Sequence, residues 1–351
     1  MSTTATETTS PGPGAMLSPD PIMQMMQGSQ TTAILQAAVE LGVFDRIAEG
    51  RGDAASIATE IRASERGTRI LVDALVALGL VEQDGPGYRL SPLADTFLVT
   101  SRPAYLGGMS RIMGSEWSWI AYPRLAEAVR NGGTVLEQNV ETPQFSFWET
   151  FATSSTGVAA PASQALAEIL APWAADRKPL EVLDVACGSG LYGLTLAQRQ
   201  EHARLTLLDW PNVLAITRGT VERLGLLDRT SFLEGDIFEV PLGGPYDLIL
   251  ASHIFHHFSE ERCLELMRRL HGALNPGGKL AINDFSAAGD RIADEPFPSL
   301  FSVIMLAASH EGEAYPVSTY RRLLEQGGFA PPEVREGRGM PSRFLIAERA
   351  H

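Results

Sequence analysis

From Leu180 onward, short and continuously apolar segments alternate with segments of helical periodicity. The apolar segments read LEVLDVA, RLTLLD, TSFLEGD, YDLILASH and KLAINDF, and helical patterns such as LYGLTLAQRQ and EERCLELMRRLHGAL lie between them. A strand that is apolar throughout is buried on both faces, so the alternation predicts a parallel sheet covered by helices on both sides. The prediction for residues 179–351 is therefore a Rossmann-like, doubly wound α/β domain. Ligands of such sheets bind at the carboxyl ends of the strands.

Residues 19–105 show a different pattern, in which short helices precede a hairpin. Apolar residues recur at helical spacing in TTAILQAAVELGVFDRIAEG, DAASIATEI and ERGTRILVDALVALGL, and Ser64 is placed to cap the last of these. The segment LVEQDGPGYRLS then reads as two strands around a turn. This order predicts a mainly helical winged-helix domain. Residues 106–178 are predicted to be a helical linker that contributes to the substrate site.

The charge balance argues against nucleic acids and membranes as partners. The chain carries 28 basic and 42 acidic side chains, and its first 100 residues hold six arginines and twelve acidic residues. A DNA-binding winged helix needs a basic surface, so we interpret this domain as a dimerisation module. No apolar run reaches the roughly 18 residues that a membrane-spanning helix needs.

The N-terminal segment MSTTATETTSPGPGAML lacks the charged start and the apolar centre of a signal peptide. We therefore expect a cytoplasmic protein whose residues 1–18 form a disordered tail. Cys187 and Cys263 both lie in apolar runs, which favours neither a disulfide nor a structural zinc site. The preponderance of Arg over Lys and the abundance of Ala are typical of a bacterial, GC-rich genome.

Gly188, Gly190 and Gly193 follow the first strand with the spacing G-x-G-x-x-G. Glycines let a ligand approach the backbone, so this spacing fits a dinucleotide as well as other cofactors. Asp184 lies inside the strand, four residues before the first glycine. A carboxylate there can pair with an ammonium group but would repel a pyrophosphate. This favours S-adenosylmethionine over NAD.

Two more carboxylates follow later strands. Asp209 ends the next strand, where it can accept hydrogen bonds from ribose hydroxyls. Asp236 follows the third strand and can accept from an adenine amino group, with Ile237 and Phe238 on either side of the ring. Together with Asp184 and the glycines, these residues predict one S-adenosylmethionine site along the carboxyl edge of the sheet.

The chain from about residue 22 resembles the small-molecule O-methyltransferases of the plant caffeate and bacterial polyketide type. The matching blocks include ELGVFDRIAEG, LDVACGSG, LLDWPNVL, EGDIFEVP, NPGGKLAINDF and YRRLLEQGGF. The resemblance implies a homodimer formed through the N-terminal domain and cofactor contacts at Trp210 and Ser252. The chain departs from the family by reading DVACG for DVGGG and by carrying Ser252 where a lysine is common. It also reads Phe255-His256-His257-Phe258 where many members read Leu-His-Asp-Trp.

Three histidines lie in the segment SHIFHHFSEE, between a strand and a helix that Ser259 can cap. His256 aligns with the base position of the family, and a neutral imidazole there can take a proton from a hydroxyl group. Glu311 or Glu313 is the candidate to orient that ring. His253 is expected to pack or to form hydrogen bonds near the cofactor, and His257 is expected to face solvent.

An alternative keeps the same fold but uses a metal ion. A related branch resembles enzymes that methylate the β-carbon of α-keto acids, with a non-haem metal held by two histidines. His256 and His310 would then be the metal ligands. No metal is expected if His256 acts as a general base.

The acceptor is expected to contact large apolar residues. Four of the five tryptophans lie between residues 101 and 178, either as a core or as a wall for a planar substrate. The candidate acceptor contacts are Met113, Trp117, Trp148 and Met305. The favoured function is O-methylation of an aromatic or conjugated hydroxyl in secondary metabolism. A catalytically inactive, ligand-binding relative is the second alternative.

Overall fold

The computed structural model describes residues 17–143, 145–289, 292–338 and 341–350. It divides into two compact units, one ending at Val99 and the other beginning at Thr100. The expected disordered tail lies outside the described residues except for Leu17 and Ser18. No helix in these described ranges is long and apolar enough to cross a membrane.

The first unit consists of short helices and a two-stranded hairpin, as the sequence predicts. Ser64 accepts a hydrogen bond from the Gly67 amide and so caps α5, and Gly42 follows α2 with a φ of 71°. Phe44, Ile57 and Leu75 lie in its core. Its elements are α1 (Asp20–Met26), α2 (Gly28–Glu40), α3 (Val43–Ala48), α4 (Ala54–Glu60), α5 (Glu65–Ala77), β1 (Val81–Asp84), β2 (Gly87–Leu90) and α6 (Pro92–Phe97).

The second unit is built on a seven-stranded sheet with the order β5-β4-β3-β6-β7-β9-β8. The first five strands of this order run parallel, and β9 pairs antiparallel with both β7 and β8. The predicted doubly wound α/β fold is confirmed. The strands are β3 (Leu180–Val185), β4 (Ala203–Asp209), β5 (Thr230–Glu234), β6 (Tyr246–Ser252), β7 (Leu274–Asp284), β8 (Glu333–Glu336) and β9 (Arg343–Glu348).

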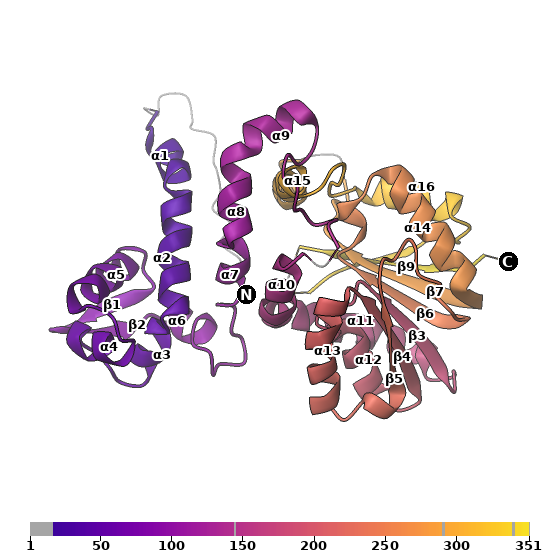
Figure 1. The fold of residues 1–351 in the computed structure, drawn as a ribbon, viewed down its shortest axis with the longest axis horizontal. Coiled ribbons are helices and arrows are strands. Elements are labelled where there is room, and N and C mark those ends of the chain that lie inside the picture. Colours follow the sequence, from indigo (N-terminus) through magenta and orange to yellow (C-terminus); the bar gives the residue numbers. More distant parts are fainter. Residues whose placement is uncertain (1–16, 144, 290–291, 339–340, 351) are drawn as a thin grey trace. The chain divides into compact units, whose positions relative to one another are not determined.

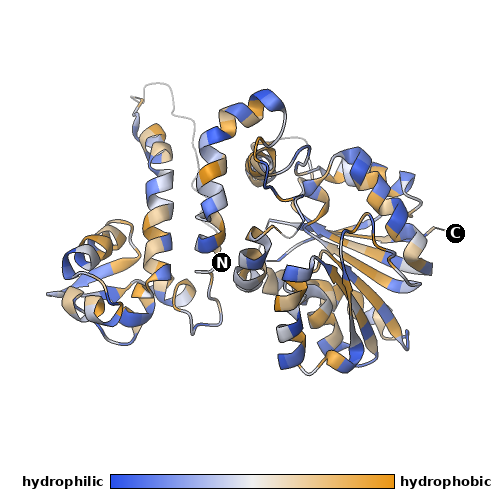
Figure 2. Cartoon of the chain, in the orientation of Figure 1, coloured by the Kyte–Doolittle hydropathy of each residue, from blue (hydrophilic) through white to orange (hydrophobic). Residues whose placement is uncertain are grey.

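Helices cover both faces of this sheet (Figure 1). Alternate residues of each central strand point to opposite faces. Leu183 and Ile249 pack toward α14 and α16, whereas Val182 and Leu248 pack toward α11 and α12. The strands are correspondingly apolar along their length (Figure 2). The covering helices are α11 (Thr156–Ala174), α12 (Leu191–Arg199), α13 (Pro211–Arg223), α14 (Glu260–Ala273) and α16 (Val317–Gln326).

Several of the remaining helices of this unit carry aromatic side chains. Rings of Trp117, Phe147 and Trp148 contact one another in sequence, with centroid separations of 5.8 and 5.4 Å. Trp117 and Trp148 pack with Phe301 and Met305 of α15 in one apolar cluster. These elements are α7 (Met109–Met113), α8 (Glu116–Ala121), the 3-10 helix η1 (Tyr122–Arg124), α9 (Leu125–Asn131), α10 (Phe147–Ser154) and α15 (Pro296–Ala308).

The structure differs from the sequence-based expectation at β7. Residues 275–278 read as a turn, yet they belong to β7, where the pairing with β6 shifts register between Tyr246 and Leu248. Next to this irregularity, the side-chain amide of Asn275 donates a hydrogen bond of 2.9 Å to Asp247 Oδ1. The short strand β8 was also not expected.

Candidate active site

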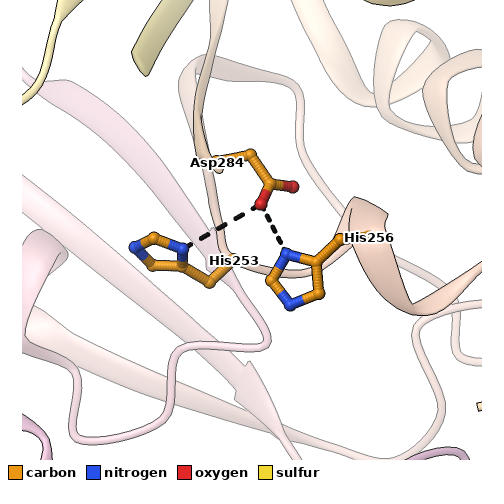
Figure 3. A group of neighbouring side chains, drawn as sticks. All are labelled: His253, His256 and Asp284. Atoms are coloured by element: carbon orange, nitrogen blue, oxygen red, sulfur yellow. Dashed lines mark hydrogen bonds and ion pairs between the residues drawn. The ribbon is translucent and has the colours of Figure 1, made fainter. Parts of the chain in front are cut away.

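The connection after β6 places His256 against Asp284, the last residue of β7. His256 lies in the 3-10 helix η3 (Phe255–His257), and its Nδ1 is 2.5 Å from Asp284 Oδ1 (Figure 3). His256 is 3% exposed and Asp284 is fully buried. The two side chains meet because β6 and β7 are neighbours whose carboxyl ends lie at the same edge of the sheet. The result is a buried imidazole–carboxylate pair.

The surroundings of Asp284 favour its ionised form. Asp284 accepts hydrogen bonds from the Tyr320 hydroxyl (2.7 Å) and from the Phe285 amide (2.8 Å). Burial raises the pKa of the Asp284 carboxyl, but its interactions with His256, His253 and Tyr320 together outweigh burial and lower this pKa to about 2. An ionised Asp284 holds the proton on His256 Nδ1 and leaves Nε2 as a proton acceptor.

The other two histidines of this segment are neutral. Burial lowers the pKa of His253 to about 4 and that of His257 well below its usual value. His257 is 5% exposed and lies edge-on against Trp148, with a centroid separation of 5.4 Å. The expectation that His257 faces solvent is therefore wrong, because the aromatic side chain of α10 covers it.

Glu311 and Glu313, the residues predicted to orient His256, do not supply the carboxylate that contacts its ring. Glu313 is exposed and Glu311 lies in the same short loop. That loop does lie against the histidine segment, since a Cβ at Gly312 would be 2.3 Å from the His256 carbonyl oxygen. The carboxylate at the ring comes instead from Asp284. Sequence reasoning missed Asp284, although its place at the carboxyl end of a predicted strand was a usable signal.

His310 is directed toward a different partner. Its Nδ1 is 3.1 Å from Glu141 Oε1, and its backbone amide donates to the same oxygen at 2.7 Å. Its side chain is 61% exposed. In the metal-dependent alternative, His310 would be the second metal ligand. One of its two ring nitrogens already contacts the Glu141 carboxylate.

His253, His256 and Asp284 bring three potential metal-binding atoms within 4.8 Å of one another (Figure 3). Two ligands of one ion, each bonded at about 2.1 Å, lie about 3 Å or more apart. The 2.5 Å contact between His256 and Asp284 is shorter than that separation. A shared proton explains it better than a preformed metal site.

The Gly-rich turn after β3 is organised around Asp184. Asp184 is 1% exposed, and its Oδ2 accepts a hydrogen bond of 2.9 Å from the Gly193 amide in the first turn of α12. Gly188 and Gly190 have φ angles of 55° and 74°, which favour glycine. A Cβ at Gly190 would also lie 2.9 Å from Thr217 Cγ2. The backbone of this turn therefore requires glycine.

Burial raises the pKa of Asp184 to about 8, with a contribution from the charge of Asp209 and a partly opposing one from the Gly193 amide. The ionised form of a buried carboxyl with one protein hydrogen bond is stabilised most by a cationic partner. The position is thus suited to the ammonium group that the sequence predicts for it.

Asp209, at the end of β4, ties the turn to the next strand. Its Oδ2 accepts from the Gly188 amide at 2.8 Å, and its Oδ1 accepts from the Trp210 amide at 2.7 Å. Burial raises the pKa of Asp209 to about 6, against the effect of these two hydrogen bonds. One carboxylate thereby fixes the Gly-rich turn beside the start of α13.

The remaining predicted cofactor residues follow β5 and β6. Asp236 Oδ1 accepts from the Phe238 amide at 2.8 Å, and Phe238 packs edge-on against Phe258 at 4.9 Å. Ile237 is 7% exposed and belongs to the core of the sheet. The Ser252 hydroxyl is buried and has no hydrogen-bond partner among the described residues.

Three of the four predicted acceptor contacts come together. Trp117, Trp148 and Met305 share one cluster with Phe301, whose ring lies 4.8 Å from the His256 ring. Met113 is 43% exposed and is not part of that cluster. The cluster therefore places aromatic surface directly beside the candidate base.

Replacing Gly193 by alanine is expected to destabilise the protein by about 1–3 kcal/mol, because the new Cβ would lie 2.9 Å from Asp184 Oδ2. Gly219 in α13 offers a matched control, since a Cβ there would meet only Arg223 Nη1 at 3.7 Å. Gly219→Ala should be neutral or stabilising by up to about 1 kcal/mol. Urea unfolding of both variants checks this, and equal stabilities would contradict the tight packing at Gly193.

Known proteins resemble the chain along nearly its whole length. Residues 23–100 match the model of an O-methyltransferase dimerisation domain, and residues 122–330 match that of an O-methyltransferase domain. The acetylserotonin O-methyltransferase of Mus musculus molossinus is 30% identical, over 93% of this chain and 88% of its own. The tetracenomycin polyketide synthesis 8-O-methyl transferase of Streptomyces glaucescens is 29% identical, over 89% and 91%. The solved structure of an inferred O-methyltransferase from Nostoc punctiforme superposes with a TM-score of 0.88 at 30% identity, covering 95% of this chain and all of that one.

Proposed function

Because this chain belongs to the O-methyltransferase family and is an S-adenosylmethionine-dependent methyltransferase, we propose that it methylates a hydroxyl group on an aromatic or conjugated small molecule. The observation that carries the proposal is the buried His256–Asp284 pair beside the aromatic cluster. The tetracenomycin relative, by its name, methylates a polyketide. That likeness supports an acceptor from secondary metabolism.

S-adenosylmethionine, when bound, supplies a methyl group on a sulfonium. The buried Asp184 carboxyl and the unpartnered Ser252 hydroxyl suit the charged methionine end of this cofactor. Asp209 and Trp210 would hold the ribose side, and Asp236, Ile237 and Phe238 the adenine ring. Gly188 and Gly190 would let the cofactor approach the backbone. This donor set fits the cofactor along one edge of the sheet.

His256 would act as the general base. Its Nε2 would take the proton of the acceptor hydroxyl while Asp284 holds the opposite side of the ring. Asp284 remains ionised, so the imidazolium that forms is stabilised by a full negative charge. The cluster of Trp117, Trp148, Phe301 and Met305 would position a planar acceptor and exclude water from the reacting groups.

A direct test of this function can use a panel of acceptors in place of the natural one. Purified protein is incubated with S-adenosylmethionine carrying a labelled methyl group and a set of phenols, naphthols and hydroxylated polyketides. We expect label on a phenolic oxygen, identified by mass spectrometry. Cofactor binding in calorimetry without transfer to any hydroxyl, but with transfer to a carbon acid, would overturn the proposal of O-methylation.

We also propose that the chain is a homodimer through a winged-helix domain over residues 19–105. The matching dimerisation model supports this, as does the exposed apolar surface of α1, where Met25 and Met26 are 78% and 70% exposed. Light scattering should give twice the mass of the chain. Replacing both methionines with glutamate should shift it toward the monomer, and a monomeric wild-type protein would contradict the proposal.

A further inference from the structure

His253 follows β6 in an unusual backbone conformation. Its φ of 56° lies in the left-handed region, which a residue with a Cβ seldom adopts. The His253 amide donates a hydrogen bond of 2.7 Å to the carbonyl oxygen of Asn283 on β7. Strained conformations persist where the surroundings enforce them, and they concentrate at functional sites. The side chain of His253 is therefore held in a defined direction at the end of the two central strands.

A chain of buried polar contacts fixes the His253 ring. The Asn283 amide nitrogen donates to the Tyr192 hydroxyl oxygen at 2.7 Å and lies 3.0 Å from His253 Nε2. Since an amide NH₂ group only donates, Nε2 accepts in this arrangement and the imidazole proton resides on Nδ1. Asn283 is fully buried and Tyr192 is 8% exposed, so the contacts are shielded from water.

The protonated nitrogen of His253 faces the carboxylate that holds His256. His253 Nδ1 lies 4.0 Å from Asp284 Oδ1, is buried and has no hydrogen-bond partner among the described residues. Phe285 packs against the ring with a centroid separation of 4.6 Å. A separation of 4.0 Å is too long for a hydrogen bond, so the interaction is one between the N–H dipole and the charge.

We propose that His253 is a positioning residue for methyl transfer, whose ring, held by Asn283 and Tyr192, directs a second imidazole N–H at Asp284 and so tunes the Asp284–His256 pair. This inference rests on the proposed role of His256 as the base. Nothing in the arrangement requires His253 to touch the acceptor or to exchange a proton. Its neutral state at working pH, a consequence of the lowering of its pKa by burial, agrees with such a role.

The same contacts join the base to the cofactor turn. Tyr192 lies in the first turn of α12, next to Gly193, whose amide holds Asp184. Asp184 is thus connected to His256 first along the α12 backbone from Gly193 to Tyr192, and then through Asn283, His253 and Asp284. The helix that shapes the donor site therefore also shapes the base.

Two variants test this role without removing a proposed catalytic group. His253→Gly tolerates the left-handed conformation and leaves no side-chain N–H facing Asp284, and Tyr192→Phe removes one hydroxyl only. We expect His253→Gly to lower kcat about tenfold, as for a coupled hydrogen-bond network. The dissociation constant of S-adenosylmethionine and the KM of a phenolic acceptor should change less than about twofold. Tyr192→Phe should produce a smaller change of the same kind.

The pH profile separates positioning from loss of structure. Without the N–H of His253, Asp284 attracts the His256 proton more strongly, so the low-pH limb of kcat should move to higher pH. The titratable groups facing this pair are His253, His257, Tyr320, Cys263 and Tyr192. An unmoved profile with an unchanged kcat in His253→Gly would overturn the proposal.

A double variant provides the strictest control. If His253 acts through His256, adding His253→Gly to His256→Asn should cause no further loss of rate, whereas two independent losses that multiply would contradict the proposal. A second readout needs no acceptor. The His256 Nδ1 proton in its short hydrogen bond should give a strongly downfield NMR signal that shifts in His253→Gly. If the wild-type protein methylates no hydroxyl, only the proposed function is contradicted. If the NMR signal does not shift, the proposed role of His253 is contradicted.

Discussion

His256→Asn should lower kcat by a factor of about 10² to 10⁴ and leave the affinity for S-adenosylmethionine within about twofold of the wild-type value. The asparagine removes the basic nitrogen but keeps an N–H that can donate to Asp284, so the buried carboxylate is not left without a partner. Methyl transfer to a phenolic acceptor and calorimetric titration of the cofactor measure the two quantities. A variant that keeps most of its rate would make His256 structural and reduce the mechanism to proximity.

Two control variants define the role of His256 further. Asp284→Asn should lower kcat to a similar extent, because a neutral amide cannot stabilise the imidazolium. His310→Ala should be nearly as active as the wild-type protein, since His310 is exposed and paired with Glu141. If His310→Ala were instead inactive and lost a bound metal ion that His256→Asn also lost, the metal-dependent alternative would replace the general base.

Asp184→Asn should weaken the binding of S-adenosylmethionine by about two orders of magnitude. The substitution preserves the size of the side chain and an oxygen that can accept from the Gly193 amide, but it removes the charge that would pair with the ammonium group. Calorimetry or equilibrium dialysis gives the dissociation constant. Glu181→Gln at the opposite end of the same strand is the matched control and should bind normally.

The pH dependence of binding has a defined sign. The pKa of Asp184 is raised to about 8 in the ligand-free protein, mainly by burial, so the carboxyl is protonated at neutral pH and must lose its proton to meet an ammonium group. Affinity should therefore rise with pH, by up to roughly tenfold per pH unit between about 6.5 and 7.5. Two other groups titrate outside this pH window. The pKa of Asp209 is about 6, below the window, and the pKa of the α-amino group of the cofactor is about 7.7, above it.

The raised pKa of Asp184 also makes the stability of the ligand-free protein depend on pH, in the direction opposite to that of cofactor binding. Between about pH 4 and about 8 the folded chain retains a proton on Asp184 that the unfolded chain has lost, so stability falls as pH rises through this range of pKa values. Asp184→Asn should remove this contribution together with the pH dependence of binding. A dissociation constant that is the same at about pH 6.5 and about pH 7.5 in the wild-type protein would contradict the assignment of Asp184 to the ammonium group.

The fold was predictable because its determinants are local. Continuous apolar strands, the glycines of the turn and the Ser64 cap each carry their signal within a few residues. The pairing of His256 with Asp284 was not predictable in this way, because it depends on β6 and β7 being neighbours in the sheet. The burial of His257 likewise depends on Trp148, which is far away in the sequence. The sequence offered Glu311 or Glu313 as the group that orients the ring, but it could not reveal that the carboxylate comes from Asp284.

The position of β9 in the sheet has a consequence for biosynthesis. β9 follows β7 and β8 in the sequence but lies between them, and it supplies the second neighbour of the strand that ends in Asp284. During synthesis, β7 therefore leaves the ribosome long before its partner and exposes an open edge, which is prone to pair with other chains. The sheet that carries the candidate site would therefore be completed only late in folding. Yields of active enzyme should consequently depend on chaperones that shield the nascent chain over this interval.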